Sequence, residues 1–119
     1  MGIATREAYG QALAELGKEN GNIVVLDGDL AKSTFSVTFG KQFPDRFFNV
    51  GIDEANLVGL AAGLALAGKL PFASSFAVFL SDKGYDQLRM CVAYPQVNAK
   101  FCGSHGGISI GEDGPSQQS

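Results

Sequence analysis

The sequence has little charge and few reactive side chains. Of its 119 residues 18% are charged, one is a histidine and two are cysteines, and the net charge is −3. It lacks a basic run, which argues against nucleic acid as the main partner. It also lacks an apolar run of about 18 residues with the flanks of a membrane span. Arg6 and Glu7, close to the amino end, argue against a signal peptide. We therefore expect a cytoplasmic protein that binds neither nucleic acid nor membrane.

The two cysteines, Cys91 and Cys102, do not have the spacing of metal ligands. We expect both to be buried, reduced thiols, as is usual in cytosolic proteins. Hydrophobic residues make up 45% of the chain, which is an ordinary balance for a globular protein. The length predicts one domain over residues 1–119.

The segment 47–68 reads FFNVGIDEANLVGLAAGLALAG and dominates the sequence. Its first residues, 47–50, predict a short strand, and residues 54–68 predict a long helix. This helix has no charge from Ala55 to Gly68 and is apolar nearly all round, which is typical of a buried helix. Gly59 and Gly63 are four residues apart, a spacing that lets another backbone approach closely.

Two carboxylates, Asp53 and Glu54, stand at the head of this helix. Acidic residues are favoured in the first turn, where the helix dipole is positive. The alternative is that one of them points into a site and has a pKa tuned for proton transfer. A second acidic pair, Asp27 and Asp29, flanks Gly28 after a predicted strand. It is interpreted either as a polar turn or as a metal loop.

Predicted strands and helices alternate along the chain, which indicates a parallel sheet with helices on both faces, a doubly wound α/β fold. Thr5 is a candidate cap for the first helix. The polar end of the chain stops where another helix would begin, so we expect a domain that is incomplete at its C-terminus. The predicted helices cover residues 4–19, 36–43, 54–68 and 78–94, and the predicted strands cover 22–26, 47–50, 71–76 and 97–102.

The run NVGIDEANLVGLAAGLA resembles the signature of the pyrimidine-binding domain of transketolase, a thiamin-diphosphate enzyme. The resemblance continues, in the family's order, through IATREAYG, LDGDLAKS, SSFAVF and GEDGPSQQ, and so covers essentially the whole chain. It implies the pyrimidine-type module of the thiamin-diphosphate-binding fold. A complete member would continue into a further helix and strand.

The resemblance also implies a set of cofactor-binding residues. Glu54 corresponds to a catalytic glutamate that hydrogen-bonds N1′ of the aminopyrimidine and favours its imino tautomer. Asp29 corresponds to a residue near the thiazolium across the subunit interface, and Ile52 lies beside the glutamate. Phe76 and Phe79 correspond to aromatics of the aminopyrimidine pocket, although aromatics at a strand end are also typical of a core.

A second set of residues corresponds to ligands of the sugar-phosphate substrate. By resemblance Arg6 and Ser33 bind its phosphate, and His105, a catalytic candidate, contacts phosphate or hydroxyls. Without the resemblance, Arg6 and His105 are equally typical of exposed helix and loop residues. Asp113 corresponds to a residue that binds a donor hydroxyl. Gln117 replaces the family's histidine, and a glutamine cannot carry a proton at neutral pH.

Two more positions depart from the family pattern. Asp53 stands where the family more often has a small or basic residue, and it places a second carboxylate beside Glu54. Tyr85 is a candidate for a third aromatic of the pocket, at a spacing that differs by about one residue beyond Asp82.

The implied activity is transfer of a two-carbon ketol unit from a ketose phosphate to an aldose phosphate. The cofactor's diphosphate and its Mg²⁺ or Ca²⁺ are expected in a complementary domain or chain, so the chain has no metal ligand of its own and is inert alone. A homodimer is expected through the helix that begins at Glu54. The alternatives are the same module of deoxyxylulose-phosphate synthase or of a ketoacid dehydrogenase β subunit, and a non-catalytic oligomer scaffold. The run GEDGPSQQ favours transketolase.

Overall fold

The computed structural model describes residues 2–119 and contains one four-stranded parallel sheet. The strands lie in the order β2-β1-β3-β4, and every neighbouring pair is parallel. This confirms the parallel sheet predicted from the alternating pattern. The strands are β1 (Ile23–Asp27), β2 (Phe47–Asn49), β3 (Leu70–Phe76) and β4 (Lys100–Ser104).

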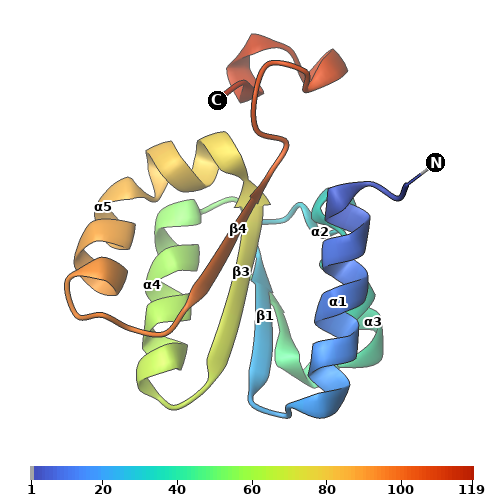
Figure 1. Ribbon diagram of the computed structural model, residues 1–119. Helices are drawn as coiled ribbons and strands as arrows, with labels where there is room; N and C mark the ends of the chain where they lie inside the picture. The colour runs from blue at the N-terminus through green and yellow to red at the C-terminus, as the bar shows by residue number, and fades with distance from the viewer. Residues whose placement is uncertain (1) are drawn as a thin grey trace.

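Helices cover both faces of the sheet, so the fold is doubly wound as predicted (Figure 1). One face carries α1 (Thr5–Glu19), α2 (Ala31–Thr34) and α3 (Val37–Gln42). The other carries α4 (Glu54–Leu66) and a segment in which α5 (Tyr85–Gln87) lies between two π-helical turns, η2 (Phe79–Lys83) and η3 (Leu88–Ala93). Within residues 2–119, no helix has the length and apolar character needed to cross a membrane.

The central strand β1 divides the core into two clusters. Its side chains alternate between the two faces, as they must in an extended strand. Ile23 and Val25 pack with Phe39 on the α1 side. Val24 and Leu26 belong to the cluster that includes residues of α4 on the other side. All five residues of β1 are buried, which explains why this strand reads as a continuous apolar run.

Helix α4 is buried on one face only, which corrects the prediction of burial all round. Leu57 and Val58 are fully buried against the sheet, but Leu60 and Leu66 are 43% and 74% exposed. A Cβ atom placed on Gly59 or Gly63 would meet no atom within 4 Å. The sheet can cover only one side of the helix, so the small-residue face lies open in this chain.

An apolar groove of about 370 Å³ adjoins this open face. It runs between α4 and the edge strand β2, and its apolar lining includes Phe48, Val50, Leu60 and Leu64. Phe48 is 43% exposed. The groove therefore adds exposed apolar surface to the open face of α4.

Several predicted boundaries are wrong for identifiable physical reasons. Ala4, not Thr5, caps α1, and it makes no side-chain hydrogen bond. The predicted helix 36–43 is present as α3, but α2 before it was not predicted; Phe35, in a left-handed conformation with φ of 63°, separates the two. Strand β4 begins at Lys100 because the chain turns just before it, where the N–H of Ala99 donates to the carbonyl of Val97.

Two further predictions need correction. The predicted helix 78–94 is interrupted at Gly84, where a Cβ atom would lie 2.8 Å from the carbonyl oxygen of Leu80. Cys91 and Cys102 are free thiols, as expected, but both are only partly buried.

The close contact between α1 and α2 yields a first prediction. A Cβ atom on Gly10 would lie 2.5 Å from the carbonyl oxygen of Phe35, and backbone cannot easily move away. Gly10→Ala should lower the free energy of unfolding by about 1–3 kcal/mol despite its better helix propensity. Urea denaturation followed by circular dichroism measures this. Gly21→Ala is the matched control, because Gly21 faces open space, and should change stability by about 0.5 kcal/mol or less. Equal stability of the two variants would contradict the packing described here.

Candidate active site

The candidate site lies at the carboxyl edge of the sheet. Because the strands are parallel, the loops that follow all of them emerge at this edge, where open α/β sheets bind ligands. The start of α1 and the segment after β4 lie at the same edge (Figure 1). Residues from distant parts of the sequence therefore meet there.

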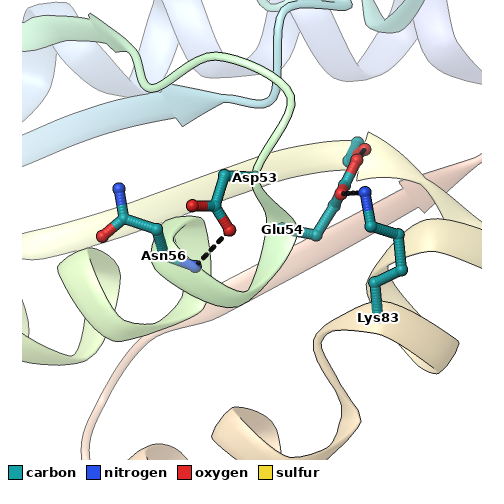
Figure 2. A network of polar contacts seen from close by, with 5 residues as sticks. Asp53, Glu54, Asn56 and Lys83 are labelled. Atoms are coloured by element: carbon teal, nitrogen blue, oxygen red, sulfur yellow. Dashed lines mark hydrogen bonds and ion pairs between the residues drawn. The ribbon is translucent and has the colours of Figure 1, made fainter.

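Asp53 and Glu54 have different environments, and the helix-start interpretation holds for Asp53. The Oδ1 of Asp53 accepts a hydrogen bond of 3.2 Å from the N–H of Asn56, so Asp53 is the N-cap of α4. Glu54 points away from this cap, toward Lys83 (Figure 2). Its side chain is 1% exposed, and its Oε1 accepts a long hydrogen bond of 3.4 Å from the hydroxyl of Ser75.

The second oxygen of Glu54 is incompletely satisfied. The Nζ of Lys83 lies 2.7 Å from Oε2, which is an ion pair by distance. Apart from this ion pair, the buried Oε2 has no hydrogen-bond partner among residues 2–119. Lys83 comes from the π-helical turn η2, and its side chain is 53% exposed. Oε2 can therefore still accept a hydrogen bond from an N–H group of a ligand.

Aromatic rings connect the surroundings of Glu54 to the histidine. Phe76 and Phe79 are stacked, with ring centroids 5.9 Å apart and planes at 15°. The ring of His105 lies 4.1 Å from that of Phe76, and the Nζ of Lys83 lies 6.0 Å from the centroid of Phe79. The two predicted pocket aromatics thus form one apolar wall with a polar group at each end.

Arg6 and His105 form a contact at the far end of this wall. One nitrogen of the Arg6 guanidinium lies 3.2 Å from Nε2 of His105 and donates a 3.0 Å hydrogen bond to the carbonyl oxygen of Ser33. The Nδ1 of His105 lies 2.8 Å from the hydroxyl of Ser104. Burial and then the Arg6 charge lower the pKa of His105, while Asp113 opposes them.

An open cavity of about 710 Å³ lies beside this pair and is lined by Arg6, His105 and Tyr9 among others. The hydroxyls of Tyr9 and Ser74 are 2.7 Å apart. Burial raises the pKa of Tyr9 and that of Cys102, which also lines the cavity. Sequence reasoning missed Tyr9, Ser74 and Lys83. Only the position of Tyr9, one helical turn after Arg6, could have indicated it.

The turn after β1 is organised by Asp27, which favours the polar-turn interpretation over a metal loop. Asp27 is fully buried. Its Oδ2 accepts hydrogen bonds of 2.7 Å from the hydroxyls of Thr34 and Ser36, and its Oδ1 accepts one of 2.6 Å from the N–H of Leu30. Asp29 is exposed, has a φ of 67°, and accepts a 2.7 Å hydrogen bond from the amide of Asn49.

Other predicted site residues lie at the margin. Ile52 is 73% exposed, and Tyr85 is 65% exposed. Asp113 is exposed in the short helix η4 (Gly111–Asp113), close enough to affect the pKa of His105. Gln117 ends the next short helix, η5 (Pro115–Gln117). This part of the chain rises above the sheet edge (Figure 1).

Comparison with known proteins identifies the class of this chain. The family model described as the transketolase pyrimidine-binding domain matches residues 1–119. The chain therefore belongs to the transketolase pyrimidine-binding domain family, as the sequence resemblance implied. Transketolases depend on thiamin diphosphate. The buried Oε2 of Glu54, which has no hydrogen-bond partner besides its ion pair with Lys83, and the two stacked rings fit the N–H and flat face of an aminopyrimidine.

Individual relatives share the whole region but are longer. The chain is 52% identical over 113 residues to a Methanocaldococcus jannaschii protein described as a transketolase C-terminal section, covering 95% of this chain and 36% of the relative. It is 53% identical to human transketolase over 97% of this chain, which is 18% of that enzyme. A solved split-gene transketolase, described as an inactive beta4 tetramer, is 56% identical with a TM-score of 0.82, covering 92% of this chain and 36% of that chain.

The environment of Asp27 yields a pH prediction. Burial raises the pKa of Asp27, and the hydrogen bonds from Thr34, Ser36 and Leu30 only partly offset this. The folded state therefore binds a proton at Asp27 more tightly than the unfolded state does. As the pH rises from the pKa of Asp27 in the unfolded state to its higher pKa in the folded state, the free energy of unfolding should fall. Asp27→Asn should remove this dependence. Urea denaturation from pH 4 to pH 7.5, with wild type as reference, measures it.

Wild type should gain stability relative to Asp27→Asn as the pH falls, by about 1.4 kcal/mol for each unit by which the pKa is raised. A stability difference that is independent of pH would contradict the role of burial at Asp27.

Proposed function

We propose that this chain forms the pyrimidine-binding half of a transketolase active site, which moves a two-carbon ketol unit from a ketose phosphate to an aldose phosphate. The observation that carries the proposal is the buried Glu54 carboxylate, with one oxygen held only by the ion pair to Lys83, and the stacked Phe76 and Phe79 rings beside that lysine. A buried carboxylate oxygen whose one partner is a half-exposed lysine retains the capacity to accept a hydrogen bond, and a ligand N–H would use it.

Thiamin diphosphate, when bound, supplies the carbanion chemistry of the reaction. Glu54 would accept the proton at N1′ through Oε2, which presents an anionic acceptor inside an apolar wall. Phe79, with Phe76 behind it, would pack against the aminopyrimidine ring. Ile52 and Asp29 lie on the loops after β2 and β1, where they would border the cofactor.

The sugar phosphate would occupy the cavity beside Arg6 and His105. Arg6 offers guanidinium donors suited to a phosphate, and the Ser33 carbonyl orients it through the 3.0 Å hydrogen bond. His105 would exchange a proton with substrate hydroxyls or contact the phosphate. Asp113 and Gln117 would bind hydroxyls from the C-terminal segment, and Gln117 would do so without transferring a proton.

The rest of the active site would come from a complementary domain or chain. This chain spans only 36% of the archaeal relative and 18% of the human enzyme. The split-gene relative is described as inactive when it forms a tetramer of its β chain, which supports the need for a second chain. That chain would hold the diphosphate and its Mg²⁺ or Ca²⁺, and the assembly would work in the cytoplasm, where Cys91 and Cys102 stay reduced.

The role of Glu54 can be tested in an assembly reconstituted with a diphosphate-binding transketolase chain. Glu54→Gln should lower ketol-transfer activity by about 100- to 10,000-fold, because the amide cannot act as an anionic acceptor for the N1′ proton. The near-isosteric amide keeps the packing and removes a buried charge that is only partly compensated, so it should not lower stability. A coupled ketol-transfer assay and urea denaturation measure the two effects.

Asp53→Ala provides the matched control one residue away. It removes the N-cap hydrogen bond to Asn56 and should cost about 1 kcal/mol of stability, with far less effect on activity. A larger loss of activity in Asp53→Ala than in Glu54→Gln would show that the catalytic carboxylate has been assigned to the wrong residue.

We also propose that the chain forms a homodimer through the open face of α4. The support is the uncovered surface at Gly59 and Gly63, the exposed Leu60 and the adjoining apolar groove. An isologous dimer buries the same patch on both copies. The homotetramer described for the split-gene relative shows that a similar chain self-associates.

A bulky residue on this face should weaken the dimer without unfolding the monomer. Gly63→Leu should raise the dissociation constant at least about tenfold, a loss of about 1.4 kcal/mol, because it blocks close approach of the second copy. Sedimentation velocity across a concentration series measures it. Gly21→Leu, another glycine with open space around it, should leave the dissociation constant unchanged. A monomeric wild type at micromolar concentration would contradict the proposed dimer.

A further inference from the structure

The contact between Arg6 and His105 fixes the protonation state of the histidine. An arginine side chain can only donate hydrogen bonds. The Nε2 of His105, 3.2 Å from the Arg6 guanidinium, must therefore be the acceptor and carry no proton. The proton of a neutral imidazole then sits on Nδ1, which donates to the hydroxyl of Ser104 at 2.8 Å. In this state His105 has no free proton-accepting nitrogen.

The charges around His105 come from two elements besides its own. Arg6 approaches from the first turn of α1, and Asp113 lies on η4. Tyr9 and Cys102 line the adjacent cavity, and burial keeps both of them in their protonated, neutral forms by raising their pKa values. The Arg6 charge is thus the one that opposes protonation of His105, and Asp113 is the one that favours it.

We propose that Arg6 and His105 form an anion-dependent proton switch, in which a bound phosphate group draws the Arg6 guanidinium away from Nε2 and this nitrogen then takes up a proton from water. The resulting imidazolium carries N–H groups on both nitrogens, so it donates to the phosphate through Nε2 and keeps its hydrogen bond to Ser104. Each anion bound is accompanied by one proton, and no covalent bond is made or broken.

The mobility that this switch requires is present at Arg6. Its side chain is exposed, and its partners are a carbonyl, an imidazole and the Phe35 ring, whose centroid lies 5.4 Å from the guanidinium carbon. It has no carboxylate partner in the described chain that would compete with phosphate. A dianion offers a charge-assisted, bidentate pairing that an imidazole nitrogen cannot match.

The choice of a phosphorylated sugar as the ligand rests on the proposed function. The switch adds that binding of the ligand is linked to pH. Affinity for the phosphate should increase as pH falls through the pKa of His105 in the complex. The switch also makes His105 a proton donor only when substrate is present, which ties its acid function to occupancy of the cavity.

Proton NMR of the 119-residue chain tests the switch directly, because His105 is its only histidine. The imidazole resonances are followed through a pH titration, without ligand and at saturation with ribose 5-phosphate. The pKa of His105 should rise by about one unit, a tenfold change in proton affinity. Unphosphorylated ribose at the same concentration should not change it.

Two variants separate the coupling from general electrostatics. Arg6→Gln should raise the pKa of His105 in the absence of ligand and abolish the further shift by ribose 5-phosphate. Arg89→Gln removes an exposed arginine that pairs with Asp86 on the surface and should titrate as wild type does.

The inference is overturned if ribose 5-phosphate leaves the His105 titration of the wild type unchanged. It is equally overturned if Arg6→Gln and Arg89→Gln titrate alike. These results are independent of the reconstituted transferase assay. Ketol-transfer activity without the pKa shift would contradict the switch alone. A pKa shift without any ketol transfer would support the phosphate site but contradict the proposed function.

Discussion

The burial of the Glu54 carboxylate is the constraint on which the site depends. Removing a carboxylate from water costs several kcal/mol unless nearby groups compensate it. Here the compensation is partial, since Ser75 donates a long hydrogen bond and the one counter-charge comes from Lys83, whose side chain is half exposed. A buried carboxylate of this kind destabilises the free protein. In a complex, a ligand N–H can donate the hydrogen bond that it lacks.

The parallel sheet connects this carboxylate to the second half of the site. Glu54 follows β2, Phe76 ends β3, and His105 follows β4, so the loops of three strands meet at one edge. The contacts run from Glu54 through the aromatic wall to the Arg6–His105 pair. An aminopyrimidine at one end and a phosphate at the other would therefore lie along a single surface, with the apolar rings between the two polar ends.

The fold could be predicted from the sequence to a large extent, since the apolar strands and the long helix after Glu54 have strong patterns. The pattern around α4 was nonetheless misleading. A helix whose residues are apolar on every side is expected to be buried. The sequence does not show whether the same chain or a second copy packs against each side. Gly84 could not be foreseen as an interruption of the helix predicted over 78–94, because its close backbone contact with Leu80 is a product of tertiary packing.

The candidate site residues came mainly from the family resemblance. Glu54, Phe76, Phe79, Arg6 and His105 came together in the structure, although composition and spacing alone did not distinguish Arg6 from an ordinary exposed helix residue. Lys83 was missed because it approaches Glu54 across the fold, from a π-helical turn that has no sequence signal. The role of Asp27 in holding the turn was also missed. The sequence of an acidic turn does not show whether a carboxylate faces solvent or accepts hydrogen bonds, as Asp27 does from Leu30, Thr34 and Ser36.

The central claim is that Glu54 is the pyrimidine-binding carboxylate of an active site shared with a second chain. A crystal structure of this chain assembled with a diphosphate-binding transketolase chain and thiamin diphosphate tests it most directly. The account predicts N1′ of the aminopyrimidine within hydrogen-bonding distance of a Glu54 oxygen, and the ring against Phe79. An aminopyrimidine bound elsewhere, with Glu54 still paired only to Lys83 and Ser75, would contradict it.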